Sequence, residues 1–194
     1  NEFAKNTKLK FDEGLFKIES YKSFEREFYS GVEGCYITNY NSSYIVDVEN
    51  IKVGITCLNT SWRCSGDDKN LLVGEFQIRD SLDIIGGCDV KICIMHHSFN
   101  ELQDFEVRSI KKLITENYNY LFTGHVHTNN STVNIDFNGN LFTSTAQSNS
   151  IANKDEIDFS FAMGYSIVEL DFDNMKIICK GRRYSYSRNE YVNM

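Results

Sequence analysis

Proline is absent from this sequence of 194 residues, and tryptophan occurs once. No apolar run approaches the roughly 18 to 20 residues that a transmembrane helix needs, and the polar start over residues 1–5 does not have the pattern of a signal peptide. Low-complexity segments and internal repeats are also missing, so no linker can be placed. We therefore expect a soluble protein with a single domain over residues 1–194, in which residues 1–34 form a helical lead-in.

Cys-x-x-Cys pairs are lacking as well, although the chain has six cysteines. Four of the six lie within or beside apolar runs. This distribution is typical of reduced thiols rather than of a disulfide framework. It predicts a cytoplasmic location.

Several enzyme motifs do not occur. The sequence has no Gly-x-Ser-x-Gly, no His-Glu-x-x-His and no Gly-x-x-x-x-Gly-Lys-Ser/Thr, which removes the usual signatures of serine hydrolases, zinc proteases and P-loop enzymes. The net charge of -7 makes an extended nucleic-acid backbone an unlikely main partner. The hydrophobic content of 41% is nevertheless sufficient for a core.

The four histidines of the chain form two pairs. His96 and His97 follow the apolar run Val90–Met95, and His125 and His127 follow the run Tyr120–Thr123. Such runs predict strands that are covered on both faces, and side chains just beyond the carboxyl ends of parallel strands point into the crevice where open α/β sheets bind ligands. A single histidine at a strand end is usually structural, but the joint pattern predicts a metal site. We expect Gly124 to make the turn that brings His125 to the strand end.

A coarse secondary structure follows from periodicity and turn signals. The expected strands are 35–39, 44–48, 51–58, 90–95, 120–123, 132–136, 141–145, 165–172 and 175–181. The expected helices are 13–29, 71–85 and 105–117, with a hairpin turn at Asn138-Gly139 and a polar loop over 149–160. The helix over 105–117 has the right length for a crossover that places the two histidine pairs on neighbouring parallel strands.

Two features allow more than one interpretation. The helix over 13–29 carries Leu15, Ile18, Tyr21, Phe24 and Phe28 at helical spacing, and we expect this stripe to pack on the body of the protein. The alternative is a lid over the metal site. The single tryptophan, at position 62, either closes the core or covers the site crevice.

The two histidine motifs carry a resemblance to a known family. Met95-His96-His97, followed by Gly124-His125-Val126-His127, resembles the last two metal motifs of the calcineurin-like metallophosphoesterases. The resemblance extends over about residues 35–186, and the Gly-His-x-His element is its most specific part. It implies a mixed α/β fold, a β-sandwich flanked by helices, of which this chain would be the C-terminal portion.

The resemblance also implies roles for the histidines. By position, His96 and His125 resemble ligands of one metal ion, and His127 resembles a ligand of a second ion. His97 would lie beside the site as a catalytic residue without ligating. The implied cofactors are two divalent metal ions, Mn, Fe or Zn.

The sequence departs from the family upstream. The family motifs Asp-x-His, Gly-Asp-x-x-Asp and Gly-Asn-His-Asp/Glu do not occur, and the nearest string, at residues 66–70, is in the wrong place. Ser98 replaces the family's proline after the histidine pair. We interpret the chain as lacking the first strands of the domain, and the missing N-terminal segment is an expected partner.

Two classes of function follow as hypotheses. The first is a metal-dependent phosphoester hydrolase, a phosphatase or phosphodiesterase in which a metal-bound hydroxide attacks a small or medium phosphate ester. The second is a truncated or non-catalytic module of the same fold, acting in sensing or interaction within a larger protein. Neither a membrane nor a nucleic acid is an expected partner.

Overall fold

A computed structural model describes residues 13–64, 71–125, 130–136, 139–146, 163–174 and 176–193. The elements in these ranges, in chain order, are η1 (Glu13–Lys17), α2 (Glu19–Phe28), β1 (Cys35–Ile37), β2 (Ser42–Val48), β3 (Ile51–Leu58), α3 (Glu75–Ile85), β4 (Val90–Met95), η2 (Phe99–Glu101), α4 (Asp104–Asn117), β5 (Tyr120–Thr123), β6 (Asn130–Asp136), β7 (Gly139–Thr145), β8 (Gly164–Asp171), β9 (Lys176–Ser185) and β10 (Glu190–Asn193). Each expected strand is present, with shifted ends at several of them. Asn138, the loop 149–160 and the string 66–70 lie outside the described residues.

The described chain forms two compact units. The first holds the helices, β1 to β5 and most of β6 and β7, and the second holds Gly124–Ser131, the end of β7 and the strands β8, β9 and β10. The second unit is an antiparallel sheet in the order β10-β9-β8. Its strand β10 was not expected, because the polar residues after β9 carry no strand pattern. The prediction of a single domain over 1–194 is not tested by this division and stays a prediction.

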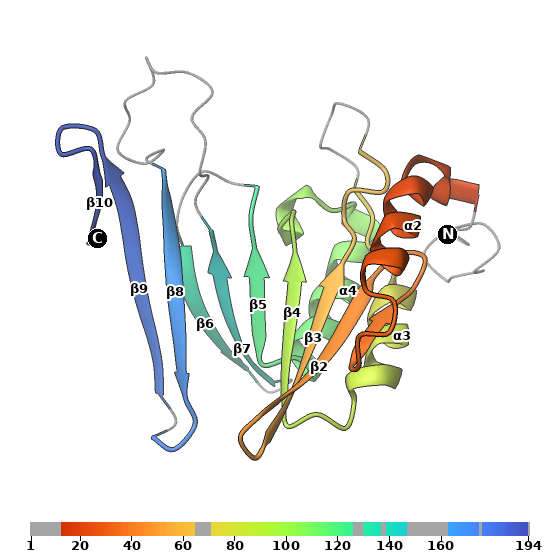
Figure 1. The fold of residues 1–194 in the computed structure, drawn as a ribbon, viewed down its shortest axis with the longest axis horizontal. Helices are drawn as coiled ribbons and strands as arrows, with labels where there is room; N and C mark the ends of the chain where they lie inside the picture. Colours follow the sequence, from red (N-terminus) through yellow and green to blue (C-terminus); the bar gives the residue numbers. More distant parts are fainter. Residues whose placement is uncertain are drawn as a thin grey trace. The chain divides into compact units, whose positions relative to one another are not determined.

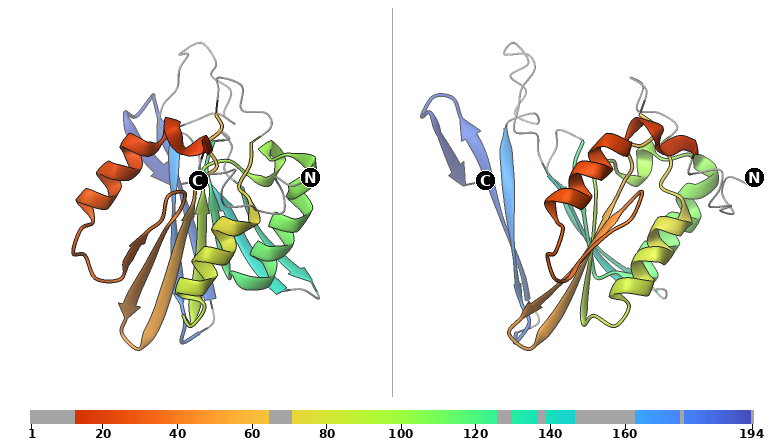
Figure 2. Two further views of the ribbon diagram at one scale, coloured as in Figure 1. Left: turned by 90° about the vertical axis from the view of Figure 1, so that its right-hand side faces the viewer. Right: turned by 45° about the vertical axis from the view of Figure 1, so that its right-hand side comes forward.

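The first unit is built on a seven-stranded sheet in the order β1-β2-β3-β4-β5-β7-β6 (Figure 1). Strands β1, β2 and β3 pair antiparallel, whereas β3, β4 and β5 pair parallel. Helices α3 and α4 lie side by side on one face of this sheet (Figure 2). The fold is therefore mixed α/β, with a mixed sheet flanked by helices, as the sequence predicts.

The three parallel strands end in a common row. Leu58 at the end of β3 is paired with Met95 at the end of β4, and Met95 is paired with Thr123 at the end of β5. Since parallel strands point the same way, the residues that follow these three leave the sheet at one edge. Both histidine pairs thus follow neighbouring strands, which confirms the predicted crossover through α4.

The hydrophobic core lies between this sheet and the two helices α3 and α4. It contains Cys93 and Leu121 from the sheet and Ile110 and Ile114 from α4, all fully buried. Gly54 on β3 lets α3 come close, because a Cβ at this position would lie 2.7 Å from the Cβ of Ile85. Side chains of this size contribute roughly 1.5–3 kcal/mol each when fully buried.

Helix α3 begins later than predicted. The sequence pattern places its start at Leu71, but the helix starts at Glu75, after Gly74 with a positive φ of 80°. The Glu106 carboxylate accepts hydrogen bonds from the backbone N–H groups of Val73 (2.7 Å) and Gly74 (3.0 Å). Burial raises the pKa of Glu106. A buried acceptor on α4 therefore holds this segment in a non-helical conformation, which no local pattern reveals.

Helix α2 buries a different face from the one predicted. Lys22 and Glu25 are buried, with 3% and 7% of their surface exposed. They form an ion pair, and the hydroxyl of Ser42 on β2 bonds to Glu25 and accepts from Lys22 Nζ at 3.2 Å. The aromatic residues expected to pack inward are more than half exposed, at Tyr21, Phe24 and Phe28. The predicted inward stripe is thus wrong for these three, whereas Leu15 and Ile18 do pack against buried residues.

The single tryptophan belongs to the core. Trp62 is buried beside Tyr40, and its Nε1–H donates to the carbonyl oxygen of Leu72 at 2.6 Å. Of the two interpretations, core closure is therefore confirmed. The Tyr40 ring packs in turn on Phe76 of α3.

Two global properties can be checked directly. All six cysteines are free thiols. Among the described residues, no helix combines the length and the apolar character that crossing a membrane requires.

The buried ion pair of α2 leads to a stability prediction. Replacement of Glu25 by alanine leaves the Lys22 charge buried without its carboxylate, which costs roughly 3–5 kcal/mol for buried pairs. Replacement of Phe24 by alanine is the matched control on the same helix, and we expect it to change the free energy of unfolding by less than about 0.5 kcal/mol because this ring is 60% exposed. Urea denaturation monitored by circular dichroism measures both. A larger loss at Phe24 than at Glu25 would contradict the observed orientation.

Candidate metal centre

The candidate site is built from the residues that follow the three parallel strands. Asn59-Thr60 comes after β3, His96-His97 after β4 and Gly124-His125 after β5. The second residue after each strand is Thr60, His97 or His125, respectively. Because the strands end in one paired row, these three residues lie near one another. Polar side chains from three strands thus meet at the carboxyl edge of the sheet, where open α/β sheets bind ligands.

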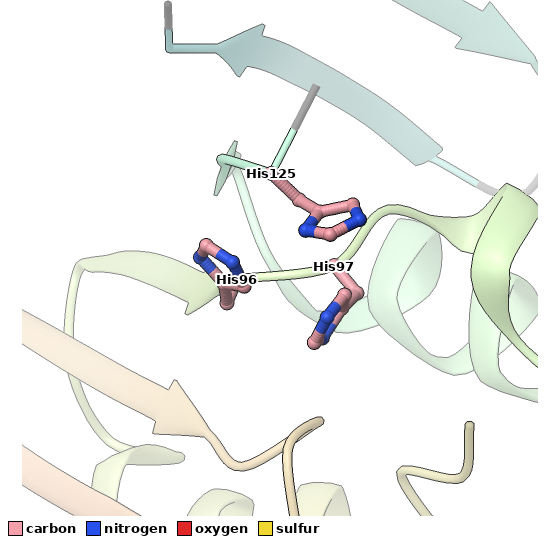
Figure 3. A group of neighbouring side chains, drawn as sticks. All are labelled: His96, His97 and His125. Carbon is pink, nitrogen blue, oxygen red and sulfur yellow. The ribbon is translucent and has the colours of Figure 1, made fainter. Parts of the chain in front are cut away.

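Three histidines converge at this edge. Each of His96, His97 and His125 has a ring nitrogen at this edge, and these three nitrogens lie within 4.8 Å of one another (Figure 3). The rings of His96 and His97 are nearly perpendicular, with centroids 4.7 Å apart and an interplanar angle of 83°. His96 is exposed and His125 is half-buried, whereas only 2% of the surface of His97 is exposed. The fourth histidine, His127, lies outside the described residues.

The turn after β5 contains a residue in the left-handed region. His125 itself has a positive φ of 66°, in the left-handed region, and Gly124 is not among the described residues with positive φ. The left-handed residue that follows β5 is therefore His125, while the role of Gly124 in this turn stays a prediction. Left-handed backbone costs a non-glycine residue roughly 1–2 kcal/mol, and such strain is typical of functional sites.

His97 is fixed by a residue that the sequence did not single out. Its Nδ1 lies 2.8 Å from the Oγ1 of Thr60, and its backbone N–H donates to the same oxygen at 3.3 Å. Thr60 is itself buried, with 1% of its surface exposed. The available signal was the position of Thr60, directly after a strand that pairs in parallel with the histidine-bearing strand.

Thr60 is in turn held by α3 through its neighbour in the sequence. The Gln77 side chain, which is fully buried, accepts from the backbone N–H of Asn59 at 2.9 Å and donates to the backbone oxygen of Asn59 at 3.0 Å. Both backbone groups of Asn59 are thereby fixed. The Asn59 side chain then accepts from the backbone N–H of Ser61 at 2.9 Å, which fixes the other side of Thr60.

The histidine group fits a metal ion in chemistry and in size. Neutral imidazole is a good ligand for Zn, Fe and Mn ions. With bonds of about 2.0–2.1 Å, two nitrogens on one zinc ion lie at most about 4.2 Å apart, so the separation of up to 4.8 Å is closed by small ring movements. Within the described ranges, the group contains no aspartate or glutamate. Metal ligation by His96, His125 and His127 stays a prediction.

The chain is thus a mixed α/β protein with a histidine cluster at the carboxyl ends of adjacent parallel strands. No family model and no curated protein matches it. Among solved structures, a single mutant of Vps29 from Entamoeba histolytica is similar at 13% identity, with a TM-score of 0.29 and 78% of this chain covered. The chain spans 60% of the length of that structure. The fold class rests on the strands and helices described above and not on this match.

The different environments of the adjacent histidines predict different effects on metal binding. His96→Ala in the full protein should abolish the binding of zinc or manganese, because His96 is exposed at the site and is a metal ligand by the family resemblance. His97→Ala should leave the metal content nearly unchanged. Elemental analysis after gel filtration measures both. Equal loss of metal at both positions would contradict the assignment.

The left-handed backbone at His125 allows a test that does not involve metal. Glycine adopts this conformation without strain, so His125→Gly should be more stable than His125→Ala by about 1 kcal/mol. Thermal unfolding of the two variants in the presence of a chelator measures the difference. As a control, the same pair of substitutions at the exposed helical position Glu27 should favour alanine. Equal stability at position 125 would show that the backbone is not left-handed there.

Proposed function

We propose that the protein is a metal-dependent phosphoester hydrolase whose site lies at the carboxyl ends of β4 and β5. The observation that carries the proposal is the approach of His96 and His125, on neighbouring parallel strands, to within 4.8 Å. The order of the two histidine motifs along the chain supports it through their resemblance to the calcineurin-like metallophosphoesterases. Structural neighbours supply no argument for it.

In this proposal the histidines have different roles as metal ligands and as a catalytic residue. His96 and His125 hold one divalent ion, Mn, Fe or Zn, and His127 contributes to a second. Such ions, when bound, polarise phosphate oxygens and make water acidic enough to act as a nucleophile near neutral pH. His97, beside the two ligands, is the proposed catalytic residue and does not ligate.

The proposed substrate is a small or medium phosphate ester. The net charge of -7 disfavours the close approach of a long polyanion, whereas a compact ester needs only the local positive charge of the metal ions. Monoesters, diesters, nucleotides and phosphoproteins all satisfy this condition. The six free thiols support a reducing compartment, and we propose the cytoplasm.

The second candidate is a non-catalytic module, and one observation favours it. The described histidine group has no carboxylate, and a metal pair is normally bridged and screened by one. The phosphoesterase hypothesis therefore requires carboxylate ligands from outside the described residues. If no such residues exist, the fold acts as an interaction or sensing domain.

The number of metal ligands that the chain supplies determines how much metal it should bind, and this provides the test of the proposal. The 194-residue chain should bind manganese or zinc weakly, below one equivalent, and should not hydrolyse an aryl phosphodiester in a metal-dependent way. A form extended upstream should bind two equivalents and show turnover that His96→Ala and His125→Ala abolish.

Elemental analysis and a chromogenic assay compare the two forms side by side. His97→Ala in the extended form is the control, since it should keep the metals while lowering turnover. An extended form that binds two metals but hydrolyses no phosphate ester would favour the non-catalytic module. Two tightly bound metals in the short form would refute the assigned ligands.

A further inference from the structure

Thr60 and His97 form a closed hydrogen-bonding unit that the proposed function does not explain. The Thr60 Oγ1 is 2.8 Å from the ring Nδ1 and 3.3 Å from the backbone nitrogen of the same histidine. Both residues are at least 98% buried. The unit links β3 to β4 across 37 positions of sequence.

The inventory of donors and acceptors decides which atom carries the hydrogen. A threonine hydroxyl has one hydrogen to donate and two lone pairs that accept. The backbone N–H of His97 occupies one lone pair of Oγ1. Among the described residues, Nδ1 of His97 is the acceptor that the structure gives for the hydroxyl hydrogen.

The opposite arrangement leaves a buried donor unsatisfied. If Nδ1 carried a hydrogen, Oγ1 would accept from both the ring and the backbone of His97, and its own hydrogen would have no acceptor among the described residues. A buried donor without a partner is costly, and buried hydroxyls are normally paired. The bonding therefore favours donation from Thr60 to Nδ1.

We propose that Thr60 is a positioning residue that donates to Nδ1 of His97 and so holds the ring in the Nε2–H tautomer. In this tautomer the only ring lone pair is on Nδ1, and Thr60 occupies it. His97 then offers a metal ion no free lone pair and presents an N–H donor instead. The proposal deepens the proposed function, since it makes His97 a hydrogen-bond donor beside two ligands.

The position of Thr60 is itself enforced from α3. The fully buried Gln77 bonds to both backbone groups of Asn59, and Gln77 also donates to the carbonyl oxygen of Val73 at 2.6 Å. Because both backbone groups of Asn59 are hydrogen-bonded, the backbone that carries the Thr60 side chain is held in place beside the ring. The helix, the loop after β3 and the histidine thus form one chain of contacts.

The tautomer can be observed directly in the 194-residue protein without any assay of activity. Long-range ¹H–¹⁵N correlation spectra of protein labelled with ¹⁵N-histidine should show His97 with an unprotonated Nδ1 and a protonated Nε2. Thr60→Val, which keeps the shape and removes the hydroxyl, should abolish this single pattern. Thr60→Ser, which keeps the hydroxyl, should retain it.

Thr56→Val is the matched control. Thr56 is a fully buried threonine on β3 whose hydroxyl accepts from Tyr118 at 3.3 Å, so its loss tests for general destabilisation and should not alter the His97 signals. An Nδ1–H pattern for His97 in the unmodified protein would overturn the proposal, and so would an unchanged pattern in Thr60→Val. If Thr60→Val does not fold, the spectra of the unmodified protein and of Thr60→Ser decide the question.

Titration with zinc separates this proposal from the proposed function. Addition of zinc should shift the ring nitrogens of His96 and His125 and leave the tautomer of His97 unchanged. A direct effect of zinc on the His97 nitrogens, with Nδ1 becoming protonated, would show that His97 is a ligand and would refute the role of Thr60. Absence of zinc binding would count against the metal site, while the tautomer measured without zinc would still decide the role of Thr60.

Discussion

The parallel register of β3, β4 and β5 is the constraint on which the candidate site depends. Leu58, Met95 and Thr123 end the three strands as paired neighbours, so the residues that follow emerge together. A slip of β4 by one residue would exchange the two faces of that strand. It would move the exposed ring of His96 to the buried position of His97, and the contact with Thr60 would be lost.

The core fixes this register, and it also supports strain at the site. On β4, Cys93 and Met95 are buried whereas Ile94 is exposed, so a slipped strand would place the wrong side chains in the core. The strain at His125, roughly 1–2 kcal/mol for a left-handed residue, is comparable to the burial of one aliphatic side chain. A core of this kind can maintain such a residue, but a weakly packed strand end could not.

The sequence predicts those features that local patterns determine. The strands other than β10 and the helix predicted over 105–117 follow from periodicity and turn signals, and the structure agrees with them apart from shifted ends. The inward face of α2 does not follow, because residues 15, 18, 22 and 25 have the same helical spacing as the aromatic stripe. The choice between the two faces depends on the bond from Lys22 to Ser42, which lies 20 positions away. Thr60 was missed for the same reason, since its partner is on another strand.

Electrostatic repulsion limits the number of divalent ions that the histidine group could bind by itself. Two divalent ions about 3.5 Å apart repel each other by on the order of 20 kcal/mol at an effective dielectric constant of about 20. Neutral imidazoles supply lone pairs but no negative charge, and the described group is made of histidines. Under the proposed function, the histidines alone would therefore hold one ion with modest affinity, and a pair of ions would require carboxylates. Hydrolysis in that proposal depends on acidic ligands in addition to the histidines that follow β4 and β5, because these histidines supply no negative charge.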